Sequence, residues 1–587
     1  MTSYATEEVD RLPHGSAEKT RRYATERYTG AVGLNWYDSD PTLQFQMQSR
    51  LGAQALQWAT PHLQRAGALM AGPISELAVQ TDKQPAYLQR YDRWGHDISE
   101  VVMPASFIEA RRLLVENSFS SPEFTAAAES ARVNPAVIRT AHSYLLDQAD
   151  IGMACAMGTG GDMVLSLAAQ FAPGAAQVRL KEVLQEGSSN GETAQLLTER
   201  TGGSDLARLE TTARRDGDAW LLNGLKWFVS NVIGAAYVVL AKPEGAPDGT
   251  SGIAPFLVLR ERADGTPNGI RIRRLKDKLG TKSVASAEVE LVDAEAFMLA
   301  PYDETPGEDG GQRSRGLARM MSLTNSSRLG VAMMGLGCAR RSLVESLLYS
   351  RSREAFGGAL DTQPLMQRKL AELIVEVEAA QALVFDGFLG PQLRIGAPLI
   401  KLRAARLGIT AASDAIEVHG GNGYIEQWPV ARILRDAQVN TVWEGPDNIL
   451  CLDVRRAMDK EDAHVALYER VRDAISNSGA DDDTTGLVAA GLTDLEEAVA
   501  GSRKLDPVTA EARLFPLTQH MVDVYAGALL LEEAGAAKGT AAADRKALIA
   551  RLYARSHLAT LQPLERITGP AEEIERWSEL RDGALID

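Results

Sequence analysis

HGGNGYIEQWPVARILRDAQVNTVWEGPDNI, residues 419–449, is the most informative stretch of the chain. It joins a glycine-rich turn (Gly420, Gly421, Asn422, Gly423) to a short charged helix and then to Trp443-Glu444-Gly445. Glycines after a helix let the backbone approach a ligand closely, so main-chain N–H groups can hold phosphates. Glu444 precedes a residue without a side chain, which leaves room for a substrate against the peptide. The pattern is typical of a cofactor turn followed by a proton-abstracting base.

The composition is that of a soluble globular protein with several substructures. The chain has 587 residues, of which 45% are hydrophobic and 24% charged. Its net charge of −16 opposes general affinity for nucleic-acid backbones or anionic membranes. Three widely spaced cysteines and a polar, acidic start without a signal peptide predict a reducing cytoplasmic setting. The most apolar run, 329–339, is too short to span a bilayer and predicts a buried helix.

The periodicity changes twice along the chain. Apolar residues recur at helical spacing in the first third, except for a loop-like centre around residues 83–93. Short β-rich segments follow, and helical spacing then resumes to the end. No strand–helix alternation appears, so a Rossmann nicotinamide site is not expected. Scattered histidines and unpaired cysteines predict no metal site. The expected parts are an N-terminal arm (1–40), an all-α domain (41–190), a central β domain (191–300), a four-helix-type domain (301–458) and a helical C-terminal extension (459–587).

Three further motifs can carry chemistry. LLTERTGGSD (196–205) offers hydroxyls and N–H groups to a phosphate or a polar ring edge. LKWFVSN (225–231) offers an aromatic wall and a hydroxyl, and SRSREAFGGALDTQPLMQRKLAEL (350–373) places Arg353 and Phe356 at a helix end. Taken alone, the first motif is equally typical of a capped helix-to-strand loop, whereas the second is more typical of a core strand. An isolated arginine of the third motif is typical of a solvated side chain, and Glu444 alone is more typical of a surface acid.

Together and in this order, the motifs resemble the acyl-CoA dehydrogenase family of flavoproteins over most of residues 40–458. The matching elements are the TE-x-x-GGSD loop, the K-W-F-x-S strand, RLKDKLGTKSVASAEVEL (274–291), R-x-A-F-G and HGGNGY…RD…WEG…NI. In detail they are most similar to the AidB-like (alkylation-response) branch, which also has a long C-terminal tail. The resemblance implies an α domain, a β-barrel-like domain and an α-helical bundle, followed by the helical extension.

The resemblance also implies the cofactor and its contacts. FAD is expected between the domains, partly held by a neighbouring subunit of a homodimer or homotetramer. The implied FAD-binding residues are Thr198, Gly203, Ser204, Phe228, Ser230, Arg353, Phe356, Gln363, Gly420, Gly421, Asn422, Gly423 and Asn448.

The implied reaction is the α,β-dehydrogenation of an acyl-CoA. Glu444 is expected to take the α-proton while flavin N5 takes the β-hydride, with Arg328 and Gly445 at the substrate. An electron-transferring flavoprotein is the expected electron acceptor. Two positions depart from the family pattern: Pro446 replaces the usual Thr or Ser beside the base, and Asn325 stands where some relatives have an acid that positions CoA.

Alternative functions remain open at this stage. AidB-like proteins suggest a flavoprotein that binds and protects DNA, which requires basic residues against the phosphates. Residues 459–587 contain 14 Lys and Arg against 24 Asp and Glu, a net charge of −10, which disfavours DNA binding. Acyl-CoA oxidases share the expected fold and use oxygen to reoxidise the flavin, so an oxidase is a further alternative. Nitroalkane oxidases share the fold as well, but Glu rather than Asp at position 444 disfavours their chemistry. A purely structural role is disfavoured because Glu444 and every motif are retained.

Overall fold

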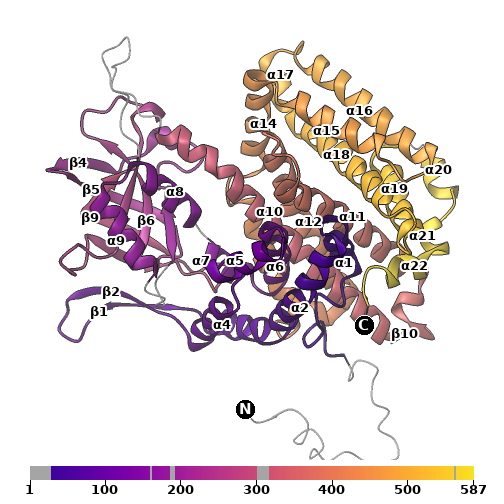
Figure 1. Ribbon diagram of the computed structural model, residues 1–587, viewed down its shortest axis with the longest axis horizontal. Helices are drawn as coiled ribbons and strands as arrows, with labels where there is room; N and C mark the ends of the chain where they lie inside the picture. The colour runs from indigo at the N-terminus through magenta and orange to yellow at the C-terminus, as the bar shows by residue number, and fades with distance from the viewer. Residues whose placement is uncertain (1–27, 159–160, 186–191, 300–315, 561–562, 587) are drawn as a thin grey trace, which may run out of the picture.

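The computed structural model describes residues 28–158, 161–185, 192–299, 316–560 and 563–586. A β domain lies at one end of a central helical bundle, and the C-terminal extension packs on the side of the bundle away from that domain (Figure 1). The expected fold class is confirmed: the chain is mostly helical, with a central β domain and a helical extension. No helix in the described ranges is long and apolar enough to cross a membrane.

Several N-terminal helices begin with a proline that directly follows an N-cap residue. Asp40, Ser121 and Asn134 each accept a hydrogen bond from a backbone N–H of the first turn, and each precedes a proline. The cap pairs a free N–H group, and proline fits the first turn because it has none. The helices of this domain are α1 (Pro41–Arg50), α2 (Ala53–Leu69), the π-helical turn η3 (Met70–Ile74), α3 (Ser75–Lys83), α4 (Ala105–Glu116), α5 (Pro122–Ser130), α6 (Pro135–Ala149), α7 (Ile151–Gly158), α8 (Gly161–Phe171) and α9 (Gly174–Gln185).

A β-hairpin interrupts this helical domain where the sequence predicts only a loop-like stretch. Strands β1 (Tyr87–Tyr91) and β2 (Asp97–Val102) pair antiparallel. The Ser99 hydroxyl oxygen accepts a hydrogen bond of 2.9 Å from the N–H of Ile272. The hairpin therefore joins the N-terminal domain to the β domain.

The central strands close into a ring. In the main sheet the order is β3-β6-β4-β5-β9-β7, β8 pairs with β9, and β6 pairs with β7 as well as β4. Strands β6, β4, β5, β9 and β7 thus form a closed circuit, which confirms the barrel-like domain. The strands are β3 (Thr193–Leu196), β4 (Thr212–Asp216), β5 (Ala219–Ser230), β6 (Ala236–Pro243), β7 (Ala254–Leu259), β8 (Ile270–Leu275) and β9 (Ser286–Met298), with 3-10 turns η4 (Leu206–Arg208) and η5 (Thr250–Gly252).

Strand β6 is buried on both faces because each face has its own cover. Successive side chains point to opposite sides of a strand. Tyr237 and Val239 pack in the cluster formed by the β strands, whereas Val238 and Leu240 pack in a second cluster with residues of α8 and α9. The strand therefore reads as a continuous apolar run rather than an alternating one.

The C-terminal domain brings two long helices into backbone contact. A Cβ atom on Gly335 of α10 would lie 2.4 Å from the carbonyl oxygen of Ala404 in α12, so only glycine fits there. This close packing sets the distance between the side chains that the two helices carry. The elements are α10 (Gly316–Ser352), β10 (Glu354–Ala355), β11 (Gly358–Ala359), η6 (Leu360–Thr362), α11 (Pro364–Leu389), α12 (Gly396–His419), η7 (Gly420–Tyr424), α13 (Pro429–Ala437), η8 (Gln438–Thr441) and α14 (Asp447–Glu461).

Buried ion pairs and a shared apolar core attach the extension to the bundle. Glu378 of α11 accepts hydrogen bonds from Arg545 and, at 3.0 Å, from Lys546 of α19. One hydrophobic cluster includes residues from the N-terminal domain, the bundle and the extension. The helices of the extension are α15 (His464–Ser476), α16 (Asp482–Ser502), α17 (Pro507–Ala512), α18 (Leu514–Ala536), α19 (Ala543–His557), α20 (Pro563–Thr568), α21 (Glu572–Glu575) and α22 (Trp577–Asp582).

Candidate active site

Glu444 lies in a short turn between η8 and α14. Both Glu444 and Gly445 adopt positive φ angles, 56° and 103°. A glutamate rarely adopts this left-handed conformation, and such strained residues gather at functional sites. The side chain is half-buried. Among the described residues, neither its carboxylate nor its backbone N–H has a hydrogen-bond partner, so both groups are available to a ligand.

Two cations from different helices hold this turn. Arg328 of α10 donates from Nε to the carbonyl oxygen of Glu444 at 3.3 Å. Lys401 of α12 donates from Nζ to the carbonyl oxygen of Gly445 at 2.8 Å. Burial raises the pKa of the Glu444 carboxyl, and the positive charges of Arg328 and Lys401 oppose part of that rise. The carboxylate is therefore a stronger base than an exposed glutamate.

Arg328, which the resemblance places at the substrate, is bound to groups of this chain. Its side chain is buried, and its guanidinium donates to Asp453 and, at 3.1 Å, to the amide oxygen of Asn325. Asp453 also accepts a hydrogen bond of 2.8 Å from Arg394. Arg328 thus connects the Glu444 turn to a second arginine nearer the surface.

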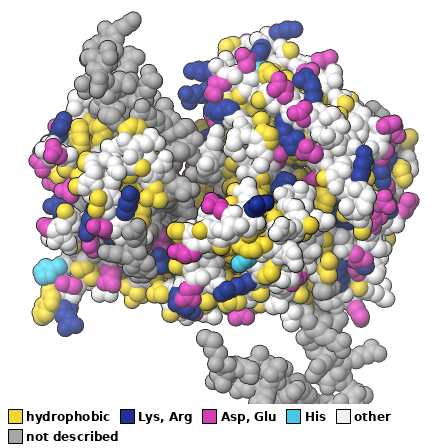
Figure 2. Space-filling model, viewed as in Figure 1, with side chains coloured by type: hydrophobic (Ala, Val, Ile, Leu, Met, Phe, Trp, Pro, Cys, Tyr) yellow, Lys and Arg dark blue, Asp and Glu magenta, His cyan; other side chains and the backbone are white. Residues whose placement is uncertain are grey.

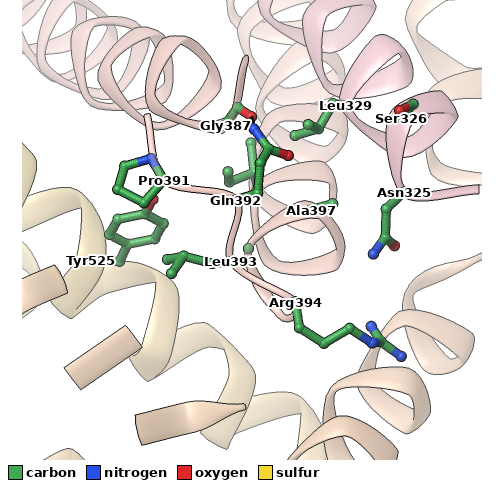
Figure 3. A pocket seen from close by; sticks show the side chains of 12 residues that line it. Asn325, Ser326, Leu329, Gly387, Pro391, Gln392, Leu393, Arg394, Ala397 and Tyr525 are labelled. Carbon is green, nitrogen blue, oxygen red and sulfur yellow. Dashed lines mark hydrogen bonds between the residues drawn. The ribbon is translucent and has the colours of Figure 1, made fainter. Parts of the chain in front are cut away.

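A cavity of about 270 Å³ lies beside this network. Figure 3 shows its lining from α10, the 390–395 loop, α12 and, through Tyr525, helix α18 of the extension. Asn325 and Arg394 line the cavity and are also members of the Arg328 network. The polar groups stand beside apolar ones, which suits an amphiphilic chain. The lining residues are Asn325, Ser326, Leu329, Gly387, Pro391, Gln392, Leu393, Arg394, Gly396, Ala397, Ile400 and Tyr525.

On the β domain, a buried ion pair joins the two predicted flavin-binding motifs. Lys226 of β5 is fully buried and donates to Glu199 at 2.7 Å. The N–H of Trp227 donates to the carbonyl oxygen of Thr198 at 2.9 Å. The loop that carries Thr198 is thus fixed beside strand β5.

The side chains around this pair are available to a cofactor. Phe228 is 52% exposed, a high value for an aromatic residue, and it lies near the end of β5 where the register with β9 shifts. Ser204 and Gly203 are exposed, and Ser230 is half-buried with its hydroxyl 3.2 Å from that of Ser286. The half-exposed ring on one motif and the exposed hydroxyl and N–H groups on the other suit a flavin and its pyrophosphate, although the ammonium of Lys276 already lies 4.9 Å from the centroid of the Phe228 ring.

The glycine-rich turn forms the 3-10 helix η7. Gly420 has a φ of 59°, and a Cβ atom on either Gly420 or Gly421 would meet nothing within 4 Å, so this backbone is open to a ligand. Gly423 differs, because its Cβ would lie 2.4 Å from the carbonyl oxygen of Ile416. Gly423 therefore serves close packing against α12. Asn422 donates to the hydroxyl of Tyr349 at 3.1 Å.

The remaining predicted FAD contacts lie at the surface of the single chain. Phe356 occupies the turn of the β10–β11 hairpin with a φ of 54° and a side chain 92% exposed. Arg353 is exposed, Gln363 is half-buried at the start of α11, and Asn448 is exposed in the first turn of α14. These groups are free to contact a cofactor or a second copy of the chain.

Sequence reasoning missed Lys401, Asp453 and the Glu199–Lys226 pair. Lys401 and Asp453 stand in helices that contain several other charged residues, and no local pattern distinguishes these two from the rest. Their partners lie 44 and 125 residues away in the chain. The described residues contain no group of three or more His, Cys, Asp or Glu side chains that could hold a metal ion.

Three family models match successive parts of the chain. The Adaptive response protein AidB N-terminal domain matches residues 29–185, the acyl-CoA dehydrogenase middle domain residues 194–294, and the acyl-CoA dehydrogenase C-terminal domain residues 314–458. These ranges contain every residue proposed above for the flavin and the base.

Individual relatives support the same assignment. The putative acyl-CoA dehydrogenase AidB of Escherichia coli is 31% identical, covering 66% of this chain and 71% of that protein. Acyl-CoA dehydrogenase family member 11 of Caenorhabditis elegans is 27% identical, covering 86% of this chain and 85% of that protein. The crystal structure of C. elegans ACDH-11 in complex with C11-CoA has a TM-score of 0.81 at 25% identity, covering 97% of this chain and 99% of that chain. The chain therefore belongs to the acyl-CoA dehydrogenase family of FAD-dependent oxidoreductases, on its AidB-like branch.

Proposed function

We propose that the protein catalyses the α,β-dehydrogenation of an acyl-CoA, with Glu444 as the base that removes the α-proton. The observation that carries this proposal is the Glu444 turn. It presents a half-buried carboxylate whose pKa is raised by burial, and a backbone N–H without an acceptor among the described residues.

Both free groups have a role in the reaction. The α-hydrogen of a thioester is weakly acidic, so the site must polarise the thioester carbonyl as well as supply a base. The N–H of Glu444 is available to donate to the thioester oxygen, as in an oxyanion hole. The α C–H bond breaks with its proton passing to the Glu444 carboxylate, the β-hydrogen leaves as hydride, and a trans-2-enoyl thioester forms. When bound, FAD supplies the acceptor for that hydride.

The residues that hold FAD come from two copies of the chain in this proposal. Thr198, Gly203, Ser204, Phe228 and Ser230 belong to the same site as Glu444. Arg353, Phe356 and Gln363 contact FAD from a neighbouring subunit of a homodimer or homotetramer, and Gly420 to Gly423 and Asn448 complete the set. The 92% exposure of Phe356 in the single chain supports this arrangement, because an apolar side chain is stabilised by burial.

The substrate enters past Arg394 and Asn325. The cavity that these residues line has side-chain amides, those of Asn325 and Gln392, that suit a pantetheine-like arm. Gly445 leaves room at the thioester. The C11-CoA bound to C. elegans ACDH-11 supports an acyl-CoA as the ligand class here. An electron-transferring flavoprotein then reoxidises the flavin.

No observation in the described residues favours DNA binding. On the face of the extension shown in Figure 2, basic and acidic side chains are interspersed. Arg551, for example, pairs with Asp481 at 2.9 Å and with Glu572. Arginines neutralised in this way have little charge left for phosphates.

An anaerobic titration with acyl-CoAs of different chain length, followed at the visible absorbance band of the flavin, tests the proposal. We expect one chain class to bleach the wild-type protein, Glu444→Gln to retain FAD without bleaching, and the matched control Glu426→Gln to behave as wild type. Glu426 is an exposed acid of the preceding loop. If no acyl-CoA bleaches the FAD-loaded protein, the proposal is wrong. Rapid recolouring of the reduced protein in air would favour an oxidase instead.

A further inference from the structure

Lys401 is the most unusual charged residue near the candidate active site. Its side chain is completely buried in α12, and its ammonium donates to the carbonyl oxygen of Gly445 at 2.8 Å. A buried ammonium is unfavourable unless polar or charged groups surround it, so its retention requires a reason. The proposed chemistry does not use it directly.

The conformation of the turn supplies one reason. Glu444 and Gly445 are successive residues with positive φ, and their two carbonyl oxygens accept hydrogen bonds from Arg328 and Lys401, respectively. The two donors come from α10 and α12, which the close contact at Gly335 holds together. A strained turn persists only where the surrounding structure fixes it. The pair of donors fixes both of its peptides.

The charges around Lys401 supply a second reason. The acids facing its ammonium are Asp447 of α14 and Glu444, and the other cations are Arg328 of α10 and Arg406 of α12. Asp447 is already paired with Arg406. The Glu444 carboxylate, by contrast, has no hydrogen-bond donor among the described residues. Lys401 is thus one of two positive charges that act on it.

We propose that Lys401 is the positioning residue of the catalytic turn: its hydrogen bond fixes the Glu444–Gly445 backbone, and its charge favours the ionised Glu444 carboxylate. The proposal rests on the proposed function in that Glu444 is assigned there as the base. Burial raises the pKa of the Glu444 carboxyl and so makes Glu444 a stronger base. Lys401 opposes part of that rise, which keeps Glu444 ionised, and its hydrogen bond keeps the turn correctly oriented.

Infrared titration of the Glu444 carboxyl tests this role without any substrate. The band of the protonated Glu444 is isolated as the difference between FAD-loaded protein with Glu444 and the same protein with Glu444→Gln. The methionine of Lys401→Met has a similar length but no charge. Because the positive charge that favours the carboxylate is lost, we expect the pH midpoint of the Glu444 titration to rise while FAD stays bound. Lys369→Met is the matched control, because Lys369 pairs with Asp414 and Glu417 on the bundle surface; its midpoint should equal that of wild type.

A midpoint in folded Lys401→Met equal to that of wild type would overturn the proposal. If Lys401→Met does not fold, the role is tested instead on the difference spectrum between the wild-type protein and Glu444→Gln. Burial lowers the pKa of Lys401 to about 8. The ammonium therefore loses its charge near that pH, and the infrared band of the Glu444 carboxylate should change there a second time. A carboxylate band that does not change near pH 8 contradicts the role. A flavin that no acyl-CoA bleaches would refute the proposed function but leave this titration readable.

Discussion

Removing the charge of Glu378 should loosen the extension from the bundle. Glu378 is buried in α11 and carries hydrogen bonds from Arg545 and Lys546 of α19. Burial alone would raise the pKa of Glu378, but the two cations bring it from 4.5 down to about 2. That difference corresponds to about 3 kcal/mol of stability, which is present above pH 4.5 and lost as the pH falls towards 2. The general cost of breaking a buried ion pair, about 3–5 kcal/mol, agrees.

Hydrogen exchange is the appropriate assay, because a chain with several domains need not unfold in one step. In Glu378→Gln, the amides of α19 should exchange roughly 150-fold faster, the factor that about 3 kcal/mol represents. The control is Glu372→Gln, which removes an exposed i,i+4 pair with Arg368 on the same helix and should change exchange little. Unchanged exchange of α19 in Glu378→Gln, or an equal effect in the control, would refute the reasoning.

Two further perturbations test other parts of the account. Burial lowers the pKa of His557, but hydrogen bonds and charges from Asp523 and Glu376 raise it to about 9; its stabilising contribution is therefore complete below pH 6.5 and lost as the pH rises through 9. The thermal midpoint should fall over that window in wild type and fall less in His557→Gln, and equal slopes would contradict the assignment. Lys226→Met leaves Glu199 buried without its cation, so the Thr198 loop should loosen and FAD should bind more weakly. Fluorescence of released flavin measures this, and wild-type retention would count against it.

The barrel and the bundle could be predicted because their patterns are local. The short segments between 195 and 300 each carry strand residues bounded by turn residues, and the apolar run at 329–339 lies within α10 as expected. The β1–β2 hairpin was missed, because its exposed strands, with Tyr87 and Tyr91 on the surface, lack a buried alternating face. Its pairing with the β domain depends on Ser99 and Ile272, which are far apart in the chain.

The site residues that belong to a local sequence motif could be predicted. The residues that only the packing of distant helices brings to the site could not. Glu444 and Gly420 stand in a recognisable stretch, and both adopt the positive φ that a close-approach turn requires. Lys401 could not be found from sequence, because only the packing of α12 against the turn before α14 brings its ammonium to the Gly445 carbonyl. Arg328 was singled out as a substrate contact. The structure adds its bond to the Glu444 carbonyl, and its contact with CoA stays a prediction.

The central claim is that Glu444 removes the α-proton of an acyl thioester. The most direct measurement is the exchange of α-deuterium into solvent from an acyl-CoA whose β-carbon is replaced by sulfur, so that no hydride can leave. We predict rapid exchange with the FAD-loaded wild-type protein and loss of exchange in Glu444→Gln, with the thioester still bound. Exchange in Glu444→Gln at the wild-type rate would show that another group is the base and would contradict the account.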